Sequence, residues 1–164
     1  MTDSDTPFFV KDIPYMERTR KFYRAQGYEA DYVWAHFSTT PFFQPTKPLQ
    51  KSRVVAITTS MPDTEVGRSN RSVYSNPIKP QPKSMYTEEL SWDKKATHTN
   101  DVASFLPLEQ LETLATEGFI GSVSPRFHCL PTEFSQKNTL EKDAPEILTR
   151  CQADKVDLAI LVPL

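Results

Sequence analysis

Two uninterrupted apolar runs limit the folds that this chain can adopt. Residues 53–59 read RVVAITT and residues 157–162 read DLAILV, so apolar and polar positions do not alternate in either run. Runs of this length, rich in β-branched side chains, are typical of strands that are covered on both faces, as in parallel sheets. The sequence therefore predicts an α/β fold with a doubly wound, mostly parallel sheet, in which residues 157–162 form a buried last strand.

The first of three expected helices lies within residues 12–28. Asp12 can cap it, Pro14 suits its first turn, and Gly27 suits the position after its last turn. Its apolar residues recur with the helical period and are expected to pack, while charged residues occupy the remaining faces. The apolar set consists of Tyr15, Met16, Phe22 and Tyr23.

A second helix is expected from Ser104 to Gly118, where Pro107 lies near the start and the glycine suits the stop. One face of this helix carries Leu108, Leu111, Leu114 and Ala115. A short strand over residues 120–124 is expected next, and Pro125 is expected to end it.

The third helix is expected to start at the sequence Asp143-Ala-Pro-Glu146. This sequence has the capping-box pattern, with an aspartate as cap and Pro145 in the first turn. The apolar residues that follow the helical period are Ala144, Ile147, Leu148 and Cys151. This helix would lead directly into the last strand.

Prolines outnumber glycines by 14 to 4, although average usage is about 5% proline and 7% glycine. Long, irregular, proline-rich connections are therefore expected. Residues 31–49 combine aromatic side chains with prolines and are expected to wrap over the core. Residues 60–100 show no sustained period and are expected to form a long loop.

Composition excludes several classes of protein. The chain has 164 residues, which suits a single α/β domain over residues 1–164. A hydrophobic fraction of 38%, a charged fraction of 24% and a net charge of -2 favour neither disorder nor nucleic-acid binding. Residues 1–10 lack the pattern of a secretory signal, and no stretch approaches ~18 consecutive apolar residues. We expect a cytoplasmic protein without nucleic-acid or membrane partners.

Ligands of open α/β sheets bind beyond the carboxyl ends of the strands. The candidate site residues are therefore those that follow the three predicted strands. After the first strand come Thr58, Thr59 and Ser60; after the second come Ser124, Arg126, His128 and Cys129; after the third come Pro163 and Leu164.

Three of the polar residues are candidates for binding a substrate. Arg126 could pair with a carboxylate through two hydrogen bonds, and His128 could transfer a proton near neutral pH. A surface arginine and a turn histidine remain the alternatives. His98, with Asp93 and Asp101 nearby in the sequence, could hydrogen-bond a ligand, although a solvated loop is an equal alternative.

The cysteines and histidines give little sign of a redox or metal centre. Cys129 and Cys151 form no CxxC motif, so both are expected to be reduced thiols. Cys129 is the possible reactive thiol, and Cys151 is expected to be buried and inert on its helix. The spacings of His36, His98 and His128 match no metal motif, and there is no glycine-rich phosphate loop. We therefore expect neither a metal nor a nucleotide cofactor.

Three stretches of the sequence nevertheless resemble a known protein family. They are PFFQPTKPLQKSRVVAITTS at residues 41–60, HTNDVASFLPLEQLETLATEGFIGSVSPRFH at residues 98–128 and VDLAILVPL at residues 156–164. In these stretches the chain resembles the glycine/sarcosine/betaine reductase selenoprotein B family, which includes the selenoprotein subunit of D-proline reductase. The middle stretch is the most specific of the three.

The resemblance implies an oxidoreductase component that cleaves a carbon–nitrogen bond reductively, with a disulfide as product or acceptor. Its substrate would be small and amino-acid-like, as glycine, betaine, sarcosine and D-proline are, and thioredoxin and other reductase subunits would be partners. In the family, the redox selenocysteine or cysteine follows the strand that LAILVPL resembles. The nucleophile would then come directly after Leu164, and none of the 164 residues would be catalytic.

Two hypotheses follow from this. The chain is the N-terminal part of a longer reductase subunit, with a UGA selenocysteine codon after Leu164 read as a stop, so that the printed chain alone is inactive. Alternatively, it is a non-catalytic module that binds a small carboxylate or a partner subunit without turnover.

Overall fold

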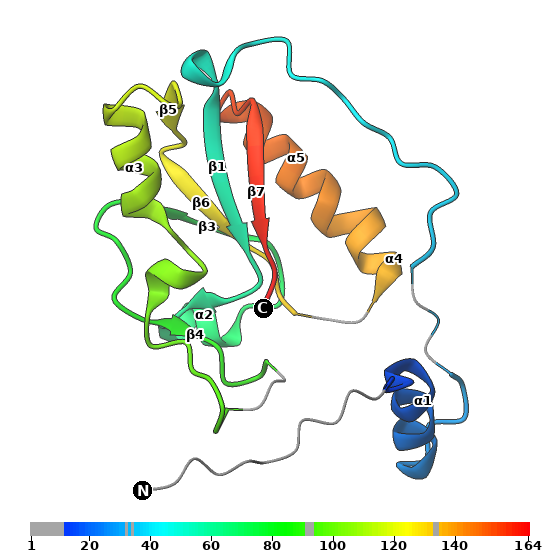
Figure 1. Cartoon of the computed structure of the whole chain (residues 1–164). Helices are drawn as coiled ribbons and strands as arrows, with labels where there is room; N and C mark the ends of the chain where they lie inside the picture. The colour runs from blue at the N-terminus through cyan, green and yellow to red at the C-terminus, as the bar shows by residue number, and fades with distance from the viewer. Residues whose placement is uncertain (1–11, 32, 34, 91–93, 133–134) are drawn as a thin grey trace, which may run out of the picture. The chain divides into compact units, whose positions relative to one another are not determined.

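A computed structural model describes residues 12–31, 33, 35–90, 94–132 and 135–164 of the chain. It divides into two compact units, Met1–Pro41 and Phe42–Leu164 (Figure 1). Among the described residues, no helix combines the length and the apolar composition that crossing a membrane requires.

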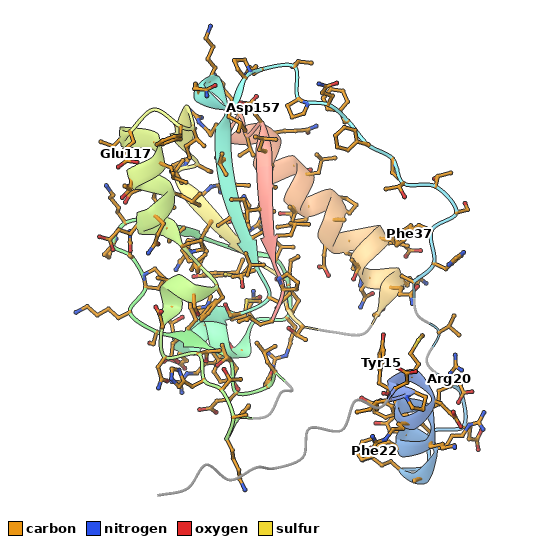
Figure 2. All side chains as sticks on the ribbon, viewed as in Figure 1. Tyr15, Arg20, Phe22, Phe37, Glu117 and Asp157 are labelled. Atoms are coloured by element: carbon orange, nitrogen blue, oxygen red, sulfur yellow. The ribbon has the colours of Figure 1, made fainter. Side chains whose placement is uncertain are left out.

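The first unit contains the helix α1, Tyr15–Ala25, as predicted. Pro14, not Asp12, is its N-cap residue, and it makes no side-chain cap bond. Gly27 lies just beyond the end with a φ of 89°, a left-handed conformation that glycine adopts without strain. Within its own unit, α1 has no buried residue, and the packing of its apolar face stays a prediction. Figure 2 shows the side chains of Tyr15 and Phe22 on this helix.

Contacts between aromatic rings stabilise α1 locally in place of a core. The Tyr23 ring makes edge-to-face contacts with Phe22 and Tyr28, at centroid distances of 5.7 and 5.5 Å. The guanidinium of Arg24 binds the Asp31 carboxylate through two hydrogen bonds of 2.9 and 2.8 Å.

In the aromatic segment at residues 31–49, the part that belongs to the second unit, from Phe42 onward, does not cover the core of that unit as predicted. Phe37, Phe42 and Phe43 are all more than 70% exposed. Tyr32 and Trp34 belong to the same prediction but lie outside the described residues.

The second unit contains a five-stranded, mostly parallel sheet, which confirms the predicted α/β fold. Its central strand β1, Arg53–Thr58, pairs in parallel with β5, Ser122–Val123, with β6, Arg126–Cys129, and with β7, Leu158–Val162. An additional strand β3, Tyr74–Pro77, pairs antiparallel with β6.

The strands β5 and β6 lie end to end along one side of β1. Ser124 N–H donates to the Val54 carbonyl and Leu130 N–H to the Thr58 carbonyl, whereas Asp157 N–H donates to the Arg53 carbonyl. Carbonyls of alternate residues point to opposite sides of a strand, so β7 lies on the other side of β1. The strand β5 ends before Pro125, as predicted, but pairing with β1 resumes at β6 with the register shifted by two residues, as in a bulge.

The last strand is less buried than its apolar sequence predicted. The strand β7 pairs with β1 along its whole length, but its three middle residues are exposed, with Leu161 at 68%. Leu158 and Val162 still pack against the core. The prediction of a buried inner strand is therefore wrong. β7 is an edge strand, and no pairing of its outer side occurs within the described part of the chain.

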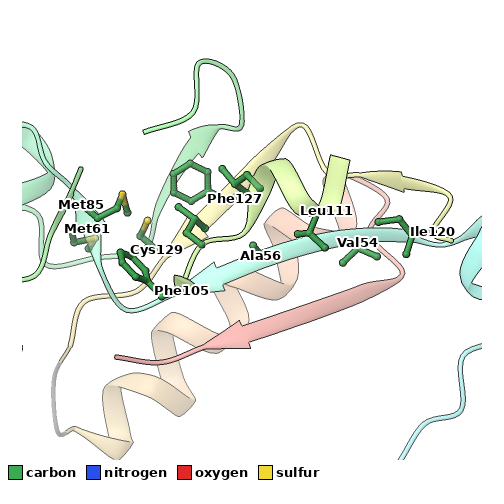
Figure 3. Close-up of a cluster of buried hydrophobic side chains, with 11 residues drawn as sticks. Val54, Ala56, Met61, Met85, Phe105, Leu111, Ile120, Phe127 and Cys129 are labelled. Carbon is green, nitrogen blue, oxygen red and sulfur yellow. The ribbon is translucent and has the colours of Figure 1, made fainter. Parts of the chain in front are cut away.

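Helices cover both faces of the sheet. The helix α3, Leu108–Thr116, supplies Leu108 and Leu111 to the main core, together with Val54 of β1 and Phe127 of β6 (Figure 3). The helix α5, Ala144–Ala153, lies on the opposite face, where Arg150 reaches Ser75 of β3. Alternating residues of β1 and β6 therefore face two different layers.

The ends of these helices differ in detail from the prediction. α3 begins after Pro107, and the 3-10 turn η2, Val102–Ser104, precedes it. Asp143 makes no side-chain cap bond, so the predicted capping box does not form. The reason is that helical structure starts earlier, with α4, Gln136–Asn138, and the π turn η3, Thr139–Asp143.

The region predicted as a long irregular loop contains several short elements. They are the strands β2, Met61–Pro62, and β4, Met85–Tyr86, which pair antiparallel, the helix α2, Glu65–Ser69, and the strand β3. Elements of two to five residues are too short to produce a readable hydrophobic period. The 3-10 turn η1, Leu49–Lys51, similarly precedes β1.

Phe127 is fully buried and Phe119 is 58% exposed. Replacing each of them by alanine, in two separate variants, tests where the core lies. Phe127→Ala is expected to lower the free energy of unfolding by about 3–5 kcal/mol, because it removes a ring and leaves a cavity. Phe119→Ala should change it by less than about 1 kcal/mol. Urea denaturation at 25 °C measures both, and equal losses would contradict the assignment of the core.

Candidate functional site

The carboxyl ends of three parallel strands meet at one edge of the sheet. Thr58 is in register with Cys129 of β6 on one side and with Val162 of β7 on the other. The segments that follow these residues therefore emerge side by side, as the rule for ligand sites in open sheets requires.

Thr59 connects these segments. Its hydroxyl Oγ1 accepts a hydrogen bond from Leu164 N–H at 2.8 Å and lies 3.2 Å from the Leu164 carbonyl, to which it donates. The Thr132 hydroxyl donates to the Thr59 carbonyl at 3.4 Å. The chain positions that follow β1, β6 and β7 are thus joined through one residue.

A small cavity adjoins Thr59, with a volume of about 30 Å³. Pro131 and Thr132 line it from the sheet side, and the segments around α2 and β4 supply the remaining lining residues: Met61, Asn70, Arg71, Tyr86, Glu89 and Leu90. A cavity of this size holds one or two water molecules, since one water needs roughly 10–15 Å³. We take this cavity and its rim as the candidate site.

The charged residues of this site are Arg71 and Glu89. The Nη2 of Arg71 donates to Oε1 of Glu89 at 2.7 Å, and more than half of each side chain is exposed. The pKa of the Tyr86 hydroxyl is raised, first by burial and then by the nearby carboxylates of Glu89 and Glu88. Tyr86 therefore stays protonated and neutral beside this ion pair.

His128 lies inside β6, not in a loop after a strand as predicted, and it is fully buried. Its Nδ1 is 2.8 Å from the Ser75 hydroxyl, which accepts a hydrogen bond from Arg150 Nη1 at 2.7 Å. Ser75 can donate its own hydrogen to Nδ1, which favours the neutral tautomer with the proton on Nε2. Nε2 is buried and has no hydrogen-bond partner among the described residues.

The environment of His128 disfavours its protonation. Burial lowers its pKa most, the charge of Arg126 lowers it further, and Arg150 adds to this effect, while Asp154 acts in the opposite direction. The imidazole therefore stays neutral in the folded protein at neutral pH.

Arg126 also lies in β6, at its first residue. Two hydrogen bonds of 2.9 Å join its guanidinium to the Asp154 carboxylate at the end of α5. Asp154 raises the pKa of Arg126, and the Asp154 carbonyl also accepts from Arg53 Nη1 at 2.6 Å. Arg126 and His128 are thus brought together on the α5 face, but neither lines the cavity.

His98 lies apart from both residues in an exposed segment, where its Nδ1 accepts from Asn100 N–H at 3.4 Å. Asp101 caps η2 through Ala103 N–H instead of approaching a ligand site. Asp93 of the same predicted cluster lies outside the described residues. The structure therefore does not assemble the polar cluster that the sequence suggested.

The two thiols lie in different environments from those predicted. Cys129 is fully buried in the core, and burial raises the pKa of its thiol to about 12. Cys151, expected to be buried, is only partly so, and its pKa is raised by burial and by Asp154. Cys129 is therefore the less reactive of the two, which reverses the predicted order.

Within the part of the chain that the structure describes, no three His, Cys, Asp or Glu side chains gather closely enough to hold a metal ion. His36 is exposed and His128 is buried, so two of the three histidines considered lie in opposite environments.

Comparisons of the chain with protein-family models, curated proteins and solved structures found no match. The site must therefore be argued from its own residues. Arg71, Tyr86 and Glu89 were missed in the sequence because they lie in the stretch predicted as an irregular loop. Arg71 follows α2, Tyr86 ends β4 and Glu89 follows β4, so only the tertiary structure brings the three residues to one cavity.

The lowered pKa of His128 predicts a pH dependence of stability. The unfolded state binds a proton near the ordinary pKa of 6.5, whereas the folded state binds it only at lower pH. The free energy of unfolding should therefore be maintained above pH 6.5 and fall below it, by at most about 1.4 kcal/mol per pH unit. In His128→Gln the slope between pH 7 and pH 5 should be shallower.

His98→Gln is the control for this prediction, since His98 is exposed. It should retain the slope of the wild-type chain. An unchanged slope in His128→Gln would show that protonation of His128 is not disfavoured by folding. The substitution itself lowers the free energy of unfolding by an amount that does not depend on pH. Comparing the slopes against pH excludes this contribution.

The buried thiol gives a separate prediction. At pH 8 a thiol with a pKa of about 12 is ionised in roughly one molecule in ten thousand, so Cys129 should react very slowly with iodoacetamide. The Cys151→Ser variant isolates Cys129, and Cys129→Ser isolates Cys151, which should react faster. In urea both thiols should react at similar rates. Rapid labelling of Cys129 in the folded Cys151→Ser chain would contradict its placement in the core.

Proposed function

We propose that the chain is the N-terminal part of an oxidoreductase of the selenoprotein-B type. It would cleave a carbon–nitrogen bond reductively in a small amino-acid-like substrate, with a disulfide or selenenylsulfide as product. The single observation that supports this is the convergence of the carboxyl ends of β1, β6 and β7 at one edge of the sheet, next to the cavity.

A selenocysteine or cysteine directly after Leu164 would begin at this edge. Thr59 binds the backbone N–H and a backbone oxygen of Leu164, so it holds the segment after β7 at this edge. Fixing a reacting group to within about 1 Å can be worth as much as 100-fold in rate. Thr59 would act as a positioning residue for the nucleophile.

The nucleophile has to be an anion, because a selenolate or thiolate attacks and its protonated form does not. Burial raises the pKa of both thiols present in the chain, which argues against either as the attacking group.

We also propose that the protein works in the cytoplasm with thioredoxin and other reductase subunits. Product disulfide must be reduced again, which suits thioredoxin and other reductase subunits in the cytoplasm, where thiols are kept reduced. Substrate-side roles of Arg126, His128 and His98 stay predictions. Use of Arg126 would require breaking its two bonds to Asp154.

A second candidate is a non-catalytic module that binds a partner subunit. The outer side of β7 favours this candidate, because Ile160 and Leu161 are 39% and 68% exposed beside an unpaired strand edge. Exposed edge strands readily pair with another chain.

The codon that follows Leu164 is the first test of the reductase. UGA with an in-frame cysteine soon after it is the expected result. UAA, UAG, or a UGA without such a cysteine would remove the proposed nucleophile. The chain as printed should show no reductase activity on glycine, betaine, sarcosine or D-proline.

The full-length protein allows a sharper test of Thr59. With thioredoxin as reductant, it should turn over substrate, and Thr59→Val should lower kcat by roughly 10- to 100-fold because the nucleophile is no longer held in place. Thr116→Val is a matched control, since this hydroxyl donates to Glu112 within α3, away from the strand ends. Equal activity of Thr59→Val and Thr116→Val would contradict the role of Thr59.

A further inference from the structure

The helix α1 has no part in the proposed function, yet it presents a well-defined surface. Its apolar face is not covered within its own unit, since none of its residues is buried. The side chains of this face are Tyr15, Met16, Phe22 and Tyr23, which are 66, 38, 60 and 38% exposed. A contiguous apolar face of this kind marks a contact surface, and the chemistry around it indicates the partner.

Two arginines lie at the borders of this face. Successive residues of a helix are turned by about 100°, so the four apolar side chains occupy roughly one third of the circumference. Arg18 lies four residues before Phe22, and Arg20 lies four residues after Met16, so each arginine neighbours one border of the face. Figure 2 shows Arg20 on this helix together with Tyr15 and Phe22. An arginine at such a border can lay its apolar stem along the surface and keep its guanidinium in a polar layer.

The charge of α1 is opposite in sign to that of the chain. The helix contains four cations and one anion, whereas the whole chain has a net charge of -2. Lys21 binds Glu17 at 2.6 Å, and Arg24 binds Asp31 at 2.8 Å, both on the side away from the apolar face. Arg18 and Arg20 are therefore the cations nearest to any surface that contacts the apolar face.

An anionic lipid surface complements both features at once. Its acyl boundary takes up apolar side chains, and its headgroups attract cations. Tyrosine suits this depth, because its ring is apolar and its hydroxyl is polar. A protein groove offers acidic groups at fixed places, whereas headgroups surround an inserted helix on both sides, as the borders of α1 require. Short helices with separate apolar and basic faces are typical of segments that lie in the plane of a membrane surface.

We propose that α1 binds the surface of an anionic lipid bilayer, with Tyr15 and Phe22 inserted at the headgroup boundary and with Arg18 and Arg20 beside lipid phosphates. This mode of binding needs no membrane-spanning helix. It does not depend on the proposed reductase activity. For a protein of the cytoplasm, the surface would be the leaflet that is rich in anionic lipids.

Sedimentation of the whole chain with lipid vesicles tests this inference. One kind of vesicle is pure phosphatidylcholine, and the other contains about 30% phosphatidylglycerol. The chain should sediment with the anionic vesicles and bind the neutral ones at least about tenfold more weakly, because the arginines lose their partners. Added salt should lower the binding to anionic vesicles, because exposed charges are screened.

Three variants separate the apolar contribution from the charged one. Phe22→Ser should lower the partition coefficient by about tenfold or more, because an inserted ring is removed. Phe22→Leu keeps an apolar side chain and should stay within about threefold of the unchanged chain. The double variant Arg18→Gln with Arg20→Gln should bind anionic vesicles about tenfold or more weakly, and its binding to neutral vesicles should not change.

Matched controls come from equal changes at other places. Phe119→Ser removes a ring of the second unit that is 58% exposed, against 60% for Phe22. The double variant Lys21→Gln with Arg24→Gln removes the same charge as the arginine pair, but from the opposite side of α1. Both controls should bind within about threefold of the unchanged chain. Circular dichroism of each variant checks that its helical content is retained.

Several outcomes would overturn the inference. They are a lack of sedimentation with anionic vesicles, equal binding to both lipids, and equal losses in Phe22→Ser and Phe119→Ser. Self-association that Phe22→Ser abolishes, without vesicle binding, would assign the apolar face to a second copy of the chain. Binding to polyglutamate as tight as binding to anionic vesicles would assign it to an acidic protein. None of these results bears on the reductase, which is tested by turnover of the full-length protein.

Discussion

The parallel pairing of β1 on both sides is the constraint on which the second unit depends. Its residues from Val54 to Thr58 are all buried, so its backbone N–H and C=O groups must find partners within the protein. β5 and β6 satisfy one side and β7 the other. This pairing brings the carboxyl ends of strands that are distant in sequence to one edge, and it separates the two faces that α3 and α5 cover.

The three helices could be read from apolar periodicity and the central and last strands from continuous apolar runs, because each element is long enough to show its pattern. How deeply β7 is buried could not be predicted from the sequence. A continuous apolar run in DLAILV indicates strand structure, but it cannot distinguish a central strand from an edge strand. The strand β6 was also missed, because Pro125 ends β5 as predicted but a second strand that pairs with β1 begins directly after it.

The site was predictable in place but not in composition. Thr59 and Leu164 follow predicted strands and meet at the carboxyl edge. Arg126 and His128 were chosen by the same rule, but they lie within β6, a separate strand that begins directly after Pro125, and interact with Asp154 and Ser75. The rule located the edge correctly, and the error was that β6 was not predicted. The cavity residues from α2 and β4 required tertiary structure.

Asp154 and Asp157 show what fixes the alignment of β7. The first binds Arg126 and Arg53 from two strands, and the second accepts from Arg53 N–H at 2.9 Å and from Lys47 at 2.7 Å. With Thr59 at the far end, β7 is anchored at both ends despite its open side. A slip by one residue would turn Leu158 and Val162 out of the core and displace the chain after β7 by about 3.3 Å. These contacts at the two ends of β7 therefore fix its register against β1.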